Sequence, residues 1–188
     1  TGVSVGGLPD GIVDNDTIAN TTIAEGKLAA NVNTITDADE WVVTADFSSA
    51  DTVITSNWAR PSYGRGAVGL IGSGMTESSG VFTFPSTGIW RIDFQTWTWA
   101  SGSNKYIRAY IMSTDNNSDY ALMTNMSQSE YRDSGNYDAG LSLSALFDVT
   151  DTSTHKVRFQ VIAENSVTWN GHANRMDTGA TFTRLGDT

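Results

Sequence analysis

The stretch GVFTFPSTGIWRIDFQTWTW, residues 80–99, predicts a β-hairpin. Apolar side chains occupy every second position on both sides of a break at 85–88; they are Phe82, Phe84, Trp90, Ile92 and Phe94. Because successive side chains of a strand face opposite ways, each half of the hairpin has one buried face. Pro85 lacks an N–H group and ends the first strand, and Gly88 permits the turn. The stretch therefore favours a β fold.

The composition extends this interpretation to most of the chain. Eighteen of the 188 residues are glycine and only 17% are charged, which is typical of all-β proteins with many turns. About ten short strands with no helical period predict a ten-stranded β-sandwich or jelly roll over residues 39–188. Besides the hairpin, strands are expected at 41–47, 53–58, 67–71, 106–112, 120–126, 141–149, 157–161, 167–169 and 180–185, and a surface loop at 127–139.

Charge and composition also exclude some classes of partner. The net charge of −10 argues against nucleic acid and anionic membrane surfaces. No apolar run approaches the ~20 residues of a membrane span, so no membrane insertion is expected. Cysteine is absent, which excludes disulfides and thiolate metal sites.

Residues 1–38 form a separate segment without aromatic side chains. Ile18, Ile23 and Leu28 are each followed by alanine and recur at every fifth position, which matches neither a helix nor a strand. Such a segment buries too little apolar surface to fold alone. It is either a flexible linker or a fibrous stem in which several chains pool these three side chains into one core.

Later segments add a resemblance to a known family. FTFPSTGIWRIDF (82–94) resembles the Phe-Pro-Gly-aromatic hairpin of the tumour-necrosis-factor-like superfamily, in its complement globular-head branch. GLSLSALFDV, HKVRFQV and ATFTRL follow in the order and spacing of that family's last three strands. The resemblance covers roughly residues 41–188 and implies a jelly roll that forms homotrimers at the end of a stalk. The chain has no collagen repeat; its Ile/Leu-Ala repeat resembles the stems of bacteriophage tail-fibre and virion-surface proteins, and SGVFTFPSTGIW resembles heads of marine phage structural proteins.

Trp97 and Trp99 share the strand parity of Arg91 and Gln95, opposite to the expected core face. Two tryptophans on a non-core face need a partner, and the resemblance places this strand around the trimer axis. We therefore expect these four residues at a subunit interface. A strand bulge that returns the tryptophans to the core and a ligand-binding platform are the alternatives.

A second set of aromatic and arginine side chains is a candidate receptor-binding surface, because Tyr and Arg are enriched at binding hot spots. The set is Tyr106, Arg108, Tyr110, Tyr131, Arg132 and Tyr137. Ordinary cross-strand surface pairs are the alternative interpretation.

Support for catalysis or metal binding is weak. His155 and His172 belong to no recognisable motif, and no nucleophile elbow is present. Paired carboxylates leave a glycosidase as a minor alternative. Asp115 and Asp119 lie in an Asx-rich turn that offers oxygen ligands for calcium but lacks EF-hand spacing, so no cofactor is expected apart from this weak calcium candidate.

These observations predict a non-enzymatic, trimeric virion-surface protein whose head binds a host glycan or protein at the tip of a phage tail fibre. Its stem would contact other virion proteins. A trimeric capsid decoration protein is the main alternative, and a glycan-cleaving fibre enzyme is a weaker one.

Overall fold

The computed structural model describes residues 35–62, 69–130 and 137–188. Every regular element in these ranges is a strand, and none of the described residues forms a helix that could cross a membrane. The compact unit that holds the strands begins at Ile35, and its first strand begins at Ala38. Predicted stem residues Ile18, Ile23 and Leu28 lie outside the described residues.

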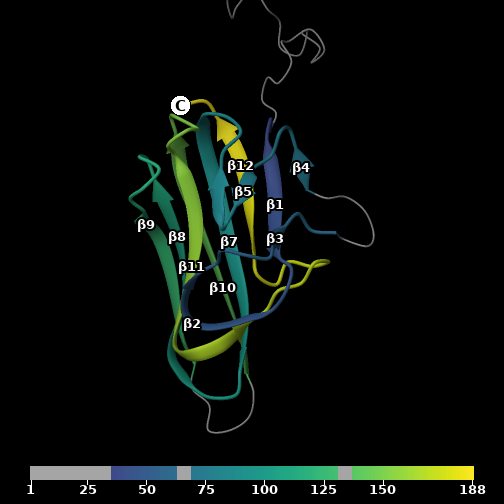
Figure 1. The fold of residues 1–188 in the computed structure, drawn as a ribbon, viewed down its shortest axis with the longest axis vertical. Coiled ribbons are helices and arrows are strands. Elements are labelled where there is room, and N and C mark those ends of the chain that lie inside the picture. Colours follow the sequence, from purple (N-terminus) through teal and green to yellow (C-terminus); the bar gives the residue numbers. More distant parts are fainter. Residues whose placement is uncertain (1–34, 63–68, 131–136) are drawn as a thin grey trace, which may run out of the picture. The chain divides into compact units, whose positions relative to one another are not determined.

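Hydrogen bonds connect the twelve described strands, which form the two layers of a jelly-roll sandwich (Figure 1). The strands are β1 (Ala38–Val43), β2 (Phe47–Val53), β3 (Trp58–Ala59), β4 (Leu70–Ile71), β5 (Thr76–Ser78), β6 (Val81–Thr83), β7 (Gly88–Ala100), β8 (Asn104–Thr114), β9 (Ala121–Glu130), β10 (Tyr137–Val149), β11 (Lys156–Trp169) and β12 (Gly179–Gly186). The all-β prediction is confirmed, and the described residues contain twelve strands where about ten were expected.

One layer has the order β3–β1–β12–β7–β10, with β4 paired to β1. The other contains β2 and β6 beside β11, followed by β8 and β9, with β5 on β6. A short pairing of Thr168 and Trp169 with β7 joins the two layers at one end. All these pairings are antiparallel, as expected for strands that bury one face each.

The two strands predicted within 80–99 are present as β6 and β7, but the predicted hairpin is wrong. β6 pairs with β5 and β11 in one layer and β7 pairs with β10 and β12 in the other, so the chain crosses between the layers at 84–87. Trp90, Ile92 and Phe94 are each at most 1% exposed, and their rings and chains pack against the opposite layer. The Phe94 and Phe159 rings stack with centroids 4.5 Å apart, which brings β7 against β11. Gly88 begins β7 at φ 134°, where a Cβ atom would lie 2.4 Å from the Gly186 carbonyl oxygen. The turn therefore requires glycine, as predicted.

Several predicted boundaries are wrong. The expected strand at 41–47 is divided, because the chain leaves β1 after Val43 and joins the other layer at Phe47. The expected strands at 53–58 and 67–71 are replaced by β2, which ends at Val53, and by the two-residue strands β3 and β4. The expected loop at 127–139 is strand at both ends, since β9 continues to Glu130 and β10 begins at Tyr137, and its middle lies outside the described residues. The segments 157–161 and 167–169 belong to one strand, β11, whose register with β2 shifts between Ile162 and Val167.

Candidate functional site

The outer face of β7 carries the predicted interface residues. Exposure alternates along the whole strand without a bulge, so Trp97 and Trp99 face away from the core, as predicted. Trp99 is 41% exposed and Trp97 is half-buried. Arg91 and Asp93 share this face and form an exposed ion pair at 2.9 Å. The placement leaves an indole at the surface of a regular sheet.

Neighbouring segments turn this face into a groove beside Trp97. Gly140 of β10 is its strand partner and has no side chain to cover the indole. The groove has a volume of about 350 Å³ and is also lined by Met176. Gln95 donates from Nε2 to the Met176 carbonyl oxygen at 2.6 Å, and the Arg175 guanidinium carbon lies 5.7 Å from the Trp97 ring centroid. Predicted residue Gln95 thus holds the loop that forms one wall.

The opposite end of the same layer is also apolar. Leu146 is the strand partner of Arg91 and is 62% exposed. Leu185 near the end of β12 is 55% exposed. The face therefore carries exposed apolar groups at both ends with charged and hydroxyl groups between them, a distribution that fits burial against another protein surface.

The outer face of the second layer carries the predicted tyrosine and arginine row. Tyr106, Arg108 and Tyr110 alternate with buried residues of β8, as predicted. The Arg108 guanidinium carbon lies 4.3 Å from the Tyr106 ring centroid, a cation–π contact. A second pair on this side was not predicted: Arg158 lies 3.9 Å above the Tyr120 ring, and burial raises the pKa of the Tyr120 hydroxyl. Two arginines stacked on tyrosines thus belong to this layer.

One other predicted receptor-binding residue is not part of this surface. Tyr137 is only 8% exposed on the core face of β10, and its hydroxyl accepts a hydrogen bond from Asn104 Nδ2 at 2.7 Å. This corrects its predicted place in an exposed loop. Tyr131 and Arg132 lie outside the described residues.

The Asx-rich turn is organised by Asn116. Its Oδ1 accepts hydrogen bonds from the backbone N–H groups of Ser118 and Asp119, and its Nδ2 donates to the Asp119 carboxylate at 3.0 Å. Among the described residues, no group of three His, Asp or Glu side chains could hold a metal ion. The geometry therefore gives the calcium candidates Asp115 and Asp119 no common site.

The two histidines make local contacts. The ring nitrogens of His155 lie within hydrogen-bond distance of Thr150 and Thr154, and His172 Nδ1 accepts a hydrogen bond from the Asn174 N–H. These partners provide neither an acidic residue to orient the ring nor an activated nucleophile.

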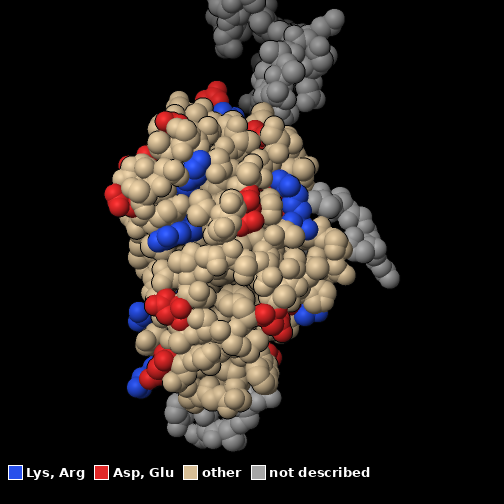
Figure 2. Space-filling model, in the orientation of Figure 1, with Lys and Arg blue, Asp and Glu red and all other residues tan. Residues whose placement is uncertain are grey.

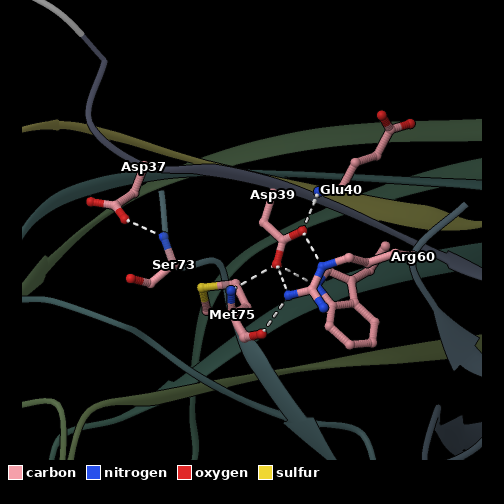
Figure 3. Close-up of polar contacts among 7 residues, drawn as sticks. Asp37, Asp39, Glu40, Arg60, Ser73 and Met75 are labelled. Carbon is pink, nitrogen blue, oxygen red and sulfur yellow. Dashed lines mark hydrogen bonds and ion pairs between the residues drawn. The ribbon is translucent and has the colours of Figure 1, made fainter. Parts of the chain in front are cut away.

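A buried carboxylate anchors the start of β1 (Figure 3). The Asp39 side chain is fully buried and accepts hydrogen bonds from Arg60 Nε and Nη2 at 2.9 and 2.8 Å. The Trp41 indole N–H and the Met75 backbone N–H donate to the same carboxylate at 2.8 and 2.7 Å. The cluster ties the segments around Arg60 and Met75 to β1, and sequence reasoning missed it. Because N–H donors of Arg60, Trp41 and Met75 occupy both oxygens of this buried carboxylate, we assign Asp39 a role in stability rather than in catalysis.

Charged groups do not form one large patch on the face shown in Figure 2. Acidic and basic side chains are interspersed there, and most of that surface carries neither. This face therefore offers no single charged patch to an oppositely charged partner.

Comparisons with known proteins identify the fold. No protein-family model matches the sequence, and no curated protein is significantly similar to it. Solved structures do match. Eiger TNF from S. frugiperda superposes with a TM-score of 0.61 at 12% identity, covering 82% of this chain and 96% of that one. Murine APRIL at pH 8.5 superposes with a TM-score of 0.55 at 12% identity, covering 79% and 98%. The chain therefore has a TNF-like jelly-roll fold.

Proposed function

We propose that this chain is a non-enzymatic virion-surface protein that forms homotrimers and carries a host-adhesion head at the tip of a phage tail fibre. The observation that supports self-association best is the outer face of β7, where Trp99 is 41% exposed beside the Trp97 groove. Covering such a face with another copy removes apolar area from water three times per trimer. The resemblance seen in the sequence implies the same oligomeric state.

The adhesive surface in this proposal is the outer face of the layer that contains β8. Tyr106 and Tyr110 offer aromatic rings, and Arg108 offers a fork of N–H donors. A trimer presents three copies of this surface on one rigid head, so weak individual contacts add up to useful avidity. A host glycan or surface protein is the target.

The assignment to a virion comes from the repeat of residues 18–29 and its resemblance to phage fibre stems. In this proposal the stem joins the head to other virion proteins and places it outside the particle. Labelling intact particles with gold-conjugated antibody against the head tests this directly. Label at the tail tip supports a fibre, whereas label over the shell favours capsid decoration.

Adhesion itself is tested by competition. Purified head, added to host cells before virions, should reduce virion adsorption in proportion to the sites it occupies. Unchanged adsorption at saturating head would refute the adhesive role. Release of oligosaccharides from host polysaccharide during the same incubation would instead identify an enzyme.

A further inference from the structure

A pocket lies within the segment that connects β1 to β3, which includes β2 at the edge of the layer that contains β8. The ends of this segment are fastened together, since Thr44 donates from its backbone N–H to the Asn57 carbonyl oxygen at 2.8 Å. All residues that line the pocket come from Phe47–Asn57. Its volume is about 250 Å³, and it is open on one side. One short segment therefore encloses a space of the size of a small ring-shaped molecule.

The walls of the pocket are held by the core. The Phe47 ring stacks on the fully buried Trp169 ring, with centroids 6.5 Å apart and planes 19° apart. The Trp169 indole N–H donates to the Ser49 carbonyl oxygen at 3.1 Å. On the other side, the Ile54 carbonyl oxygen accepts from the Trp58 indole N–H at 2.9 Å. Both walls are thus fixed before any ligand arrives, which lowers the entropy cost of binding.

The lining of the pocket is uncharged. It consists of five serine or threonine residues, one asparagine, one phenylalanine and two aliphatic residues: Ser48, Ser49, Thr52, Thr55, Ser56, Asn57, Phe47, Val53 and Ile54. At its exposed rim, the side chains of Thr55, Ser56 and Asn57 make no hydrogen bond to the described part of the chain. Hydroxyl and amide groups both donate and accept, so they match a ligand that presents several hydroxyls. An aromatic ring matches the apolar C–H face of the same ligand.

We propose that this pocket binds one neutral sugar ring, the terminal unit of a surface glycan. The absence of charge in the lining disfavours acidic sugars and phosphate, whose desolvation would need a cation. The biological role of the pocket rests on the proposed adhesion, but its ligand chemistry does not. It is a site separate from the tyrosine and arginine row on β8.

Saturation-transfer NMR with the full chain and glucose, galactose, mannose or N-acetylglucosamine tests the pocket. We expect saturable transfer to at least one sugar, with a dissociation constant on the order of millimolar, as for a small ligand in an open pocket. Ser56→Phe places a ring at the mouth and should weaken binding at least about tenfold. Ser101→Phe, at an exposed serine in the turn between β7 and β8, is the matched control and should bind like the parent chain.

Two results would overturn the proposal: no saturable transfer to any of the four sugars, or binding by the Ser56→Phe chain equal to that of the Ser101→Phe chain. Adsorption to host cells is measured in parallel with the same proteins. A chain that adsorbs but binds no sugar refutes the pocket and leaves adhesion standing. A chain that binds sugar but does not adsorb refutes adhesion and leaves the pocket standing.

Discussion

Replacing Asp39 by asparagine should be among the most destabilising single polar changes in the head. The carboxylate is fully buried and accepts from Arg60, Trp41 and Met75, and from the Glu40 backbone N–H at 3.0 Å. Asparagine keeps the shape of the aspartate side chain, but its NH₂ group would face N–H donors that now bind a carboxylate oxygen. Breaking a buried ion pair costs about 3–5 kcal/mol. Because the Arg60 side chain is 34% exposed and can be hydrated, we expect the lower end, about 3 kcal/mol.

Replacing the other partner should cost less. In Arg60→Gln, Asp39 keeps its three hydrogen bonds from Glu40, Trp41 and Met75, so its buried oxygens are not left without donors. We expect about 1.5–3 kcal/mol, the range for a hydrogen bond to a charged group. The double variant should cost less than the sum of the two, with a coupling of about 1 kcal/mol or more.

Thermal unfolding at one fixed chain concentration measures these costs, since the stability of an oligomer depends on concentration. For a domain of this size, Asp39→Asn should lower the Tm by about 6–12 °C. Lys105→Gln removes an exposed lysine from its pair with Glu164, away from the β7 face, and is the control; its Tm should stay close to that of the parent. Equal losses for Arg60→Gln and Lys105→Gln, or an additive double variant, would refute the argument from burial.

Three further predictions concern assembly and binding. Trp99→Ser should weaken the trimer by about 2.5 kcal/mol per subunit, since 41% of a roughly 250 Å² side chain is about 100 Å² of surface at ~25 cal/mol per Å²; an unchanged dissociation midpoint in dilution experiments would place the interface elsewhere. Tyr110→Ala should keep the trimer mass and Tm of the parent but lose adsorption to host cells; parent-like adsorption would make that row ordinary surface and favour capsid decoration. Replacing Ile18, Ile23 and Leu28 together by serine should make residues 12–32 sensitive to protease while the head stays folded; equally rapid cleavage of the parent stem would support the flexible linker.

The sequence predicts the strands β6 and β7 and the outward face of Trp97 and Trp99 well because one physical signal, the period of two, governs both; it does not reveal that the two strands belong to different layers. In β7 buried and more exposed positions alternate residue by residue from Gly88 to Ala100, although Thr96 and Thr98 take two of the buried positions. The same signal misleads at Phe47. Phe47 falls on the same every-second-residue apolar pattern as Trp41 and Val43, although by Phe47 the chain has already passed into the other layer.

Edge position explains the missed part of β9. Residues from Asn125 to Ser129 are exposed at successive positions, so their polar composition resembles that of a loop. Contacts between distant residues explain the missed clusters. Asp39 and Arg60 are 21 positions apart, and neither the buried carboxylate nor the pairing of Arg158 with Tyr120 leaves a periodic trace in the sequence. Tyr137 was misplaced for a related reason, since a polar stretch precedes it while its ring is buried.

Multi-angle light scattering on the purified chain tests the central claim of self-association most directly. The exposed indole of Trp99, the groove beside Trp97 and exposed Leu146 all need a covering surface, and the proposal supplies it from two further copies of the chain. At micromolar concentration the measured mass should be three times the chain mass of 20.2 kDa. A mass of 20.2 kDa at that concentration would contradict the trimer, the assignment of the β7 face and the pooled stem together.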